Sequence, residues 1–138
     1  MADYNTTHKS VKELREGSYI VIDNEPCKIV EMEFSSPGKH GSAKARITGI
    51  GIFDGQKRTL LEPADADVEV PEILKKRAQV VAVTQTGVQL MDLDTYEIFE
   101  TTIGNDEELK NNIKPGQEVE VLESMGRRII TRILGGAK

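Results

Sequence analysis

The sequence predicts an all-β protein made of two small barrels, and three observations support this. Short apolar runs bounded by turn residues recur along the whole chain, whereas the spacing typical of amphipathic helices is scarce. An acidic segment bracketed by Pro63 and Pro71 divides the 138 residues near the middle. Each half is at the lower end of the length that buries a core of its own. We therefore expect one domain over residues 1–70 and a second over residues 72–138.

The first half contains about five expected strands. Extended runs occupy residues 19–22, 27–34 and 43–53, and a further strand starts at Lys57. Between them lie the turn residues Asp23-Asn24-Glu25-Pro26, Ser35-Ser36-Pro37-Gly38 and Asp54-Gly55. We expect these strands to form an SH3-like barrel from about residue 11 to residue 70.

The second half repeats the β pattern and adds one helix. Extended runs occupy residues 79–84, 88–93, 96–101, 118–121 and 127–134. Asn105 is a candidate N-cap, acidic residues follow it and Lys110 comes later, so a short helix is expected before Pro115. Five strands with a helix between the third and the fourth is the order of an OB-type barrel.

Composition narrows the class of protein. Hydrophobic residues make up 38% and charged residues 30%, which is typical of a folded chain. The net charge of −5 argues against a protein that coats nucleic acid through bulk positive charge. The N-terminus lacks the pattern of a secretory signal and no run reaches membrane-spanning length, so we expect a cytoplasmic protein without a membrane partner. Cys27 is the single cysteine, and we expect a buried reduced thiol.

The segment from Ser35 to Lys44 is the most informative part of the chain. Pro37-Gly38 turns the backbone, Gly38 and Gly41 can adopt positive φ, and Lys39 and His40 stand between these glycines. We expect Lys39 to be displayed at an exposed hairpin tip that is poorly ordered in the isolated protein.

Positive charge gathers in the same region. No acidic residue occurs from Ser35 to Ile52, whereas Lys39, Lys44 and Arg46 lie within eight positions. These three residues are candidate RNA contacts. A solvated hairpin without an RNA partner remains an alternative on charge alone.

Other chemistry fits this segment poorly. The spacing of a phosphate-binding P-loop is absent and no helix follows. A catalytic lysine needs burial or a neighbouring cation to lower its pKa, which an exposed tip does not supply. For a metal site, His8 is the only second imidazole to accompany His40, and it lies in a tail before Val11 that we expect to be mobile. We therefore expect no catalytic residue, no metal and no enzyme activity.

Four stretches of the sequence resemble a known family. They are Pro-Cys-Lys-Ile-Val-Glu-Met at 26–32, Gly-Lys-His-Gly-Ser-Ala-Lys at 38–44, Ile-Phe-Asp-Gly at 52–55 and the acidic linker that ends at Pro71. Together they closely resemble the archaeal-type translation initiation factor 5A family, relatives of bacterial elongation factor P. Ser42 stands where eukaryotic members usually have a second histidine, and the tail before Val11 is short, as in archaeal members.

The resemblance implies that Lys39 is modified. In that family the matching lysine receives an aminobutyl group from spermidine through deoxyhypusine synthase, and hydroxylation usually completes hypusine. Whether Lys39 would carry hypusine or deoxyhypusine stays open, and no other cofactor is implied. The modifying enzyme would recognise the surrounding loop residues Pro37, Gly38, His40, Gly41, Ser42 and Lys44.

The resemblance also implies a role in protein biosynthesis. A monomeric factor would bind the ribosome near the exit site, contact rRNA and direct the modified lysine toward the acceptor end of peptidyl-tRNA. Restraining that end would promote peptide bond formation, notably at proline runs. Two alternatives remain: a generic RNA-binding OB protein that tolerates Lys39→Arg, and an interaction module without an RNA partner.

Overall fold

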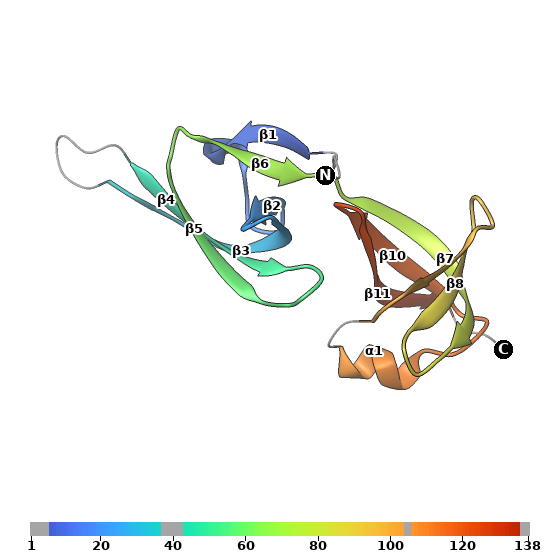
Figure 1. Ribbon diagram of the computed structural model, residues 1–138. Coiled ribbons are helices and arrows are strands. Elements are labelled where there is room, and N and C mark those ends of the chain that lie inside the picture. Colours follow the sequence, from blue (N-terminus) through green and yellow to red (C-terminus); the bar gives the residue numbers. More distant parts are fainter. Residues whose placement is uncertain (1–5, 37–42, 104–105, 136–138) are drawn as a thin grey trace. The chain divides into compact units, whose positions relative to one another are not determined.

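The structure, a computed structural model, describes residues 6–36, 43–103 and 106–135 (Figure 1). Contacts along the chain divide it into two compact units, Met1–Glu72 and Ile73–Lys138. Over the described residues, both units are built from strands, with one 3-10 turn in the first and one short α helix in the second. This confirms the predicted fold class, an SH3-like barrel followed by an OB-fold barrel.

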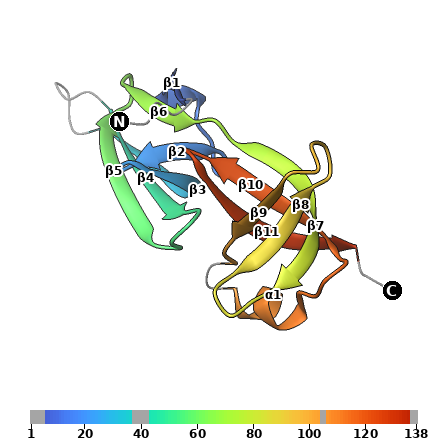
Figure 2. The same ribbon diagram turned by 45° about the vertical axis from the view of Figure 1, so that its right-hand side comes forward.

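The first unit is made of a four-stranded antiparallel sheet and a two-stranded ribbon. Its elements are β1 (Thr6–Ser10), η1 (Val11–Glu13), β2 (Tyr19–Ile22), β3 (Glu25–Ser35), β4 (Lys44–Gly51), β5 (Lys57–Pro63) and β6 (Asp67–Pro71). The sheet order is β2-β3-β4-β5, and β1 pairs with β6. β1 and β6 lie side by side in both views (Figures 1 and 2).

Alternation along the strands places the core of this unit. Ile20 and Ile22 of β2, Ile29 of β3, and Ile47 of β4 are at most 1% exposed and belong to one cluster. Successive side chains of a strand point to opposite faces, so Ile20 and Ile22, two positions apart on β2, both point into this cluster. A register shift between Ile29 and Glu31 places two β3 residues where the partner strand has one, which leaves Val30 half exposed.

Two expectations for this unit were wrong. The segment that ends at Pro71 was expected to be a linker, but residues 67–71 form β6, in which Val68 is buried in the core. The acidic residues alternate with valines, so the carboxylates of this strand can face solvent while Val68 packs inward. The tail before Val11 was expected to be mobile, but its described residues, Thr6–Ser10, form β1, where His8 pairs in register with Glu69.

The second unit is a five-stranded barrel with one helix. Its elements are β7 (Leu74–Val83), β8 (Val88–Asp92), β9 (Ile98–Thr101), α1 (Glu107–Asn112), β10 (Glu118–Ser124) and β11 (Arg127–Gly135). The sheet order is β11-β10-β7-β8-β9, and a parallel bridge between Thr102 and Ile129 brings the two edges together. Leu90, Val119 and Val121 are fully buried inside it.

Several element boundaries of this unit differ from the expectation, and the contacts explain two of them. β7 begins at Leu74 rather than Gln79, because the charged run at its start is inside the ladder: Lys76 forms ion pairs with Asp92 and Glu123 at 3.8 and 3.2 Å. The helix N-cap is Asp106, whose carboxylate accepts a hydrogen bond from the Leu109 amide at 3.0 Å. The expected cap, Asn105, lies outside the described residues.

Candidate functional site

The candidate site is carried by the hairpin formed by β3 and β4. The last rung of this pairing joins Ser35 to Lys44, and the rung before it joins Phe34 to Ala45. Ala43 is held by the turn that follows β5, because its carbonyl accepts a hydrogen bond from the Ala64 amide at 2.8 Å. Both ends of the connecting segment are therefore fixed to the sheet.

Most of the predicted site residues belong to that connecting segment. Residues 37–42, which include Lys39 and the predicted recognition residues Pro37, Gly38, His40, Gly41 and Ser42, lie outside the described residues. The expected exposed tip at Lys39 thus stays a prediction. The structure describes the two ends between which this segment runs, Ser35 on β3 and Lys44 on β4.

Lys44 and Arg46, the other predicted RNA contacts, lie on one face of β4. Both are exposed, and they alternate with Ala45 and Ile47, which are 0% exposed in the core. Period-two alternation therefore places both cations on the solvent face of the sheet. Lys44 stands between Ser35 and Pro63 in the ladder, and Arg46 stands between Glu33 and Leu61.

Two exposed apolar side chains near this site were not predicted, Phe34 on β3 and Leu61 on the adjacent strand β5. Leu61, 67% exposed, pairs with Arg46 and shares its face. Phe34, 54% exposed, pairs with the inward residue Ala45 and so points to the other face of the hairpin. The near-alternation of residues 27–34 suggested a half-buried strand to its end, but the hairpin continues past the core. Phe34 lies beyond the end of the core, and the sequence of the strand alone does not show where the core ends.

The opposite end of β4 is fixed by an ion pair. The Arg58 guanidinium donates to both Asp54 carboxylate oxygens, at 3.1 and 2.8 Å, and the Gln56 amide donates to the same carboxylate at 3.0 Å. The hydrogen bond from Arg58 is the main cause that lowers the pKa of Asp54 to about 2. This cluster closes the turn between β4 and β5 and is structural in character.

Cys27 is a packing residue, as expected. It is 0% exposed in the first core, and burial raises the pKa of its thiol. A Cβ added at Gly49 would lie 2.9 Å from the Cys27 Cβ, so the two strands approach closely at this point.

The described residues hold neither a cluster of metal-ligating side chains nor a helix able to span a membrane. No group of three or more His, Cys, Asp or Glu side chains among them is placed to hold a metal ion. None of the helices in the described ranges has the length and hydropathy needed to cross a membrane.

Comparison with known proteins identifies the family. The sequence profile described as "Translation initiation factor 5A-like, N-terminal" matches residues 4–66. Translation initiation factor 5A of Methanopyrus kandleri is 57% identical over 123 residues, which cover 89% of this chain and 90% of the relative. The protein of the same name from Pyrococcus furiosus is 53% identical over 131 residues, covering 94% and 95%.

A solved structure agrees with both the sequence match and the fold. The structure described as eukaryotic translation initiation factor 5A from Methanococcus jannaschii superposes with a TM-score of 0.85 at 44% identity, covering 94% of this chain and 95% of that one. Proteins of this name are translation factors. With relatives this similar along nearly its whole length, the chain belongs to the translation initiation factor 5A family.

Proposed function

We propose that this translation factor binds the ribosome and promotes peptide bond formation through a modified Lys39. The observation that carries the proposal is the placement of the Lys39 segment. It connects Ser35 to Lys44 at the end of a hairpin whose base is fixed by β5, with two exposed cations beside it. A rigid base with a short connecting segment is suited to carry a side chain to a target outside the protein.

The chemistry of the modified side chain fits a target made of RNA. Addition of an aminobutyl group from spermidine gives Lys39 a second amine and a longer reach than an encoded side chain has. The target is the acceptor end of peptidyl-tRNA, where phosphates and 2′-hydroxyls accept hydrogen bonds from amines. Lys44 and Arg46 contact phosphates of rRNA or tRNA from the adjacent strand, since both are exposed on one face.

The contribution to the reaction is positional. No proton transfer by the protein is required, because restraint of a mobile acceptor end lowers the entropic part of the barrier. Slow acceptors such as consecutive prolines gain most. Deoxyhypusine synthase is the modifying partner, and the residues that it reads are Pro37, Gly38, His40, Gly41, Ser42 and Lys44. The factor acts in the cytoplasm as a monomer, and Lys39 carries hypusine or deoxyhypusine as its only added group.

A reconstituted translation assay tests this function. The modified protein should increase the yield of full-length product from a message with a proline run, and should leave a message without prolines nearly unchanged. The protein made without the synthase and the Lys39→Arg protein should give no increase. Equal rescue by all three would replace this function with that of a generic RNA-binding protein, which the exposed Lys44 and Arg46 also fit.

A further inference from the structure

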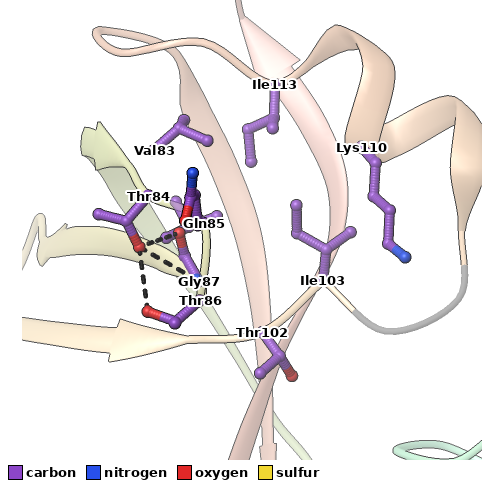
Figure 3. A pocket seen from close by; sticks show the side chains of 10 residues that line it. Val83, Thr84, Gln85, Thr86, Gly87, Thr102, Ile103, Lys110 and Ile113 are labelled. Carbon is purple, nitrogen blue, oxygen red and sulfur yellow. Dashed lines mark hydrogen bonds between the residues drawn. The ribbon is translucent and has the colours of Figure 1, made fainter.

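We propose that the second unit contains a pocket for one unstacked nucleotide of single-stranded RNA. The pocket has a volume of about 470 Å³ and lies between the loop that joins β7 to β8, the pair Thr102 and Ile103 after β9, and the residues Lys110 and Ile113 in and just after α1 (Figure 3). This volume is in the range of pockets that hold small ligands. The proposal rests on the proposed ribosome binding, and it concerns residues far in sequence from Lys39.

The pocket has an aliphatic floor. Val83, Ile103 and Ile113 turn their side chains toward a common space in the close-up view (Figure 3). Ile113 is 7% exposed and Val88, which also lines the pocket, is 1% exposed, so this surface is continuous with the core of the barrel. A planar nucleobase can bury its apolar face against such a surface while polar groups at the rim fix its orientation.

The wall formed by Thr84–Gly87 is held in place. The Thr84 hydroxyl donates to the Gly87 carbonyl at 3.0 Å and accepts from the Gly87 amide at 3.1 Å. A Cβ at Gly87 would lie 2.8 Å from the Thr101 carbonyl oxygen, so the loop can rest against β9 because position 87 has no side chain. A wall that is ordered before binding saves part of the entropic cost of association.

Polar groups at the mouth of the pocket suit the edges of a base. Gln85 and Thr86 are exposed on the same loop, and both line the pocket. An amide and a hydroxyl each offer donor and acceptor capacity, which can match the mixed edge of any nucleobase. The loop between the first and second strands of OB folds is also one of the segments that bind oligonucleotides in this architecture.

One cation stands at the rim. Of the described residues that line the pocket, Lys110 alone is charged, and its ammonium lies 3.6 Å from the Glu107 carboxylate. The Glu107 side chain is 79% exposed, and such surface pairs are weak, so a phosphate can take the place of this carboxylate at little cost. A single cation complements the single charge of a phosphodiester. A free nucleoside triphosphate carries several charges, so the nucleotide of an RNA strand is the better match.

Amide NMR spectra of the full chain, labelled with ¹⁵N, test the pocket. Addition of a short single-stranded RNA should shift signals from Thr84 to Gly87 and from Ile103, Lys110 and Ile113. ATP should bind more weakly than the RNA. The affinity for RNA should fall with salt at a slope of about −0.7 in log–log form, the value for one phosphate contact on a single strand.

Matched variants separate the pocket from general surface effects. Val83→Trp fills the pocket and should abolish the shifts, whereas Val81→Trp, on the same strand with equal exposure but outside the pocket, should leave them unchanged. Lys110→Met should weaken binding about threefold to fivefold, as expected for an exposed ion pair. Lys114→Met, whose side chain does not line the pocket, is its control.

Three results would overturn the proposal. They are an absence of shifts at the pocket with RNA at millimolar concentration, shifts confined to the first unit, and equal losses in Val83→Trp and Val81→Trp. None of these results bears on the proposed function of Lys39, which is measured by its modification and by the translation of messages with proline runs. Failure of the pocket and failure of the proposed function are therefore distinguishable.

Discussion

Ser35 and Lys44 face each other on the last rung of the β3–β4 ladder, and all residues between them belong to the segment that contains Lys39. The C-terminal end of this segment has a second restraint, because the Ala43 carbonyl accepts a hydrogen bond from the Ala64 amide in the turn after β5. The anchoring of Lys39 thus depends on three strands, whereas its chemistry depends on the segment alone. Substitutions in the segment and in the sheet should have separable effects.

Lys39→Arg should abolish modification without loss of stability. A guanidinium replaces the primary amine that attacks the aminobutyl donor, whereas the charge is kept. Substitutions at exposed positions usually change the free energy of unfolding by less than about 0.5 kcal/mol. Intact mass after co-expression with deoxyhypusine synthase reports the modification, and urea unfolding reports stability. Lys57→Arg serves as the control and should be modified normally; an added aminobutyl mass on the Lys39→Arg protein would show that another residue is the target.

Lys44→Glu and Arg46→Glu should each weaken ribosome binding and reduce its salt dependence. Each lost phosphate contact lowers the slope of log affinity against log salt by roughly 0.7 to 0.9. Lys12→Glu changes the net charge equally but lies in η1, away from this face, so it is the matched control. Co-sedimentation with ribosomes over a range of salt gives the slopes. Equal effects of all three substitutions would mean that net charge, rather than the β4 face, governs binding.

Gly49→Ala should destabilise the first unit. The new methyl group would meet the Cys27 Cβ at 2.9 Å within the core, and inserting volume into a packed core costs about 1–3 kcal/mol. A Cβ at Gly135 would have no atom within 4 Å, so Gly135→Ala should be nearly neutral. Urea unfolding of both variants provides the comparison. A Gly49→Ala protein as stable as the Gly135→Ala protein would show that the β3–β4 spacing adjusts freely.

The pairing of Asp54 with Arg58 should make stability depend on pH in the acid range. The pKa of Asp54 in the folded protein is lowered to about 2, against about 3.9 for an unfolded chain. Its contribution is therefore fully present above pH ~4 and is lost as pH falls through ~2. Asp54→Asn should lower the urea midpoint at neutral pH, and this difference should shrink on acidification.

The exposed residue Asp65 is the control for this experiment. Asp65→Asn should change the midpoint little at any pH. A gap between wild type and Asp54→Asn that stays constant down to pH 2 would contradict the role of the ion pair.

Local chemistry in the sequence was sufficient to predict much of the fold. The helix was predictable because acids follow its cap and Lys110 lies in its last turn, and turn signals such as Asp54-Gly55 separated the strands. β6 was mistaken for a linker because prolines and acids dominate its composition, while the burial of Val68 depends on a partner strand sixty residues away. Strand pairing between residues so far apart in the chain produces no pattern in the local sequence that would predict it.

In the candidate site, too, features set by neighbouring residues could be predicted, whereas features set by distant contacts could not. The glycines and the absence of acids around Lys39 are local, so the sequence pointed to it directly. The shared face of Lys44 and Arg46 follows from period-two alternation. The exposure of Phe34 and the pocket beside Lys110 could not be predicted, because each arises where elements distant in sequence meet or where the core ends.

The rate of a single peptide bond tests the central claim most directly. Ribosomes stalled between two consecutive prolines would be mixed with modified wild type, unmodified wild type or Lys39→Arg protein at saturating concentration, and dipeptide formation would be followed by rapid quench. Modified protein should raise the rate constant well above that of the other two, which should match each other within error. Equal rate constants for all three proteins would contradict a role for the Lys39 side chain in the reaction.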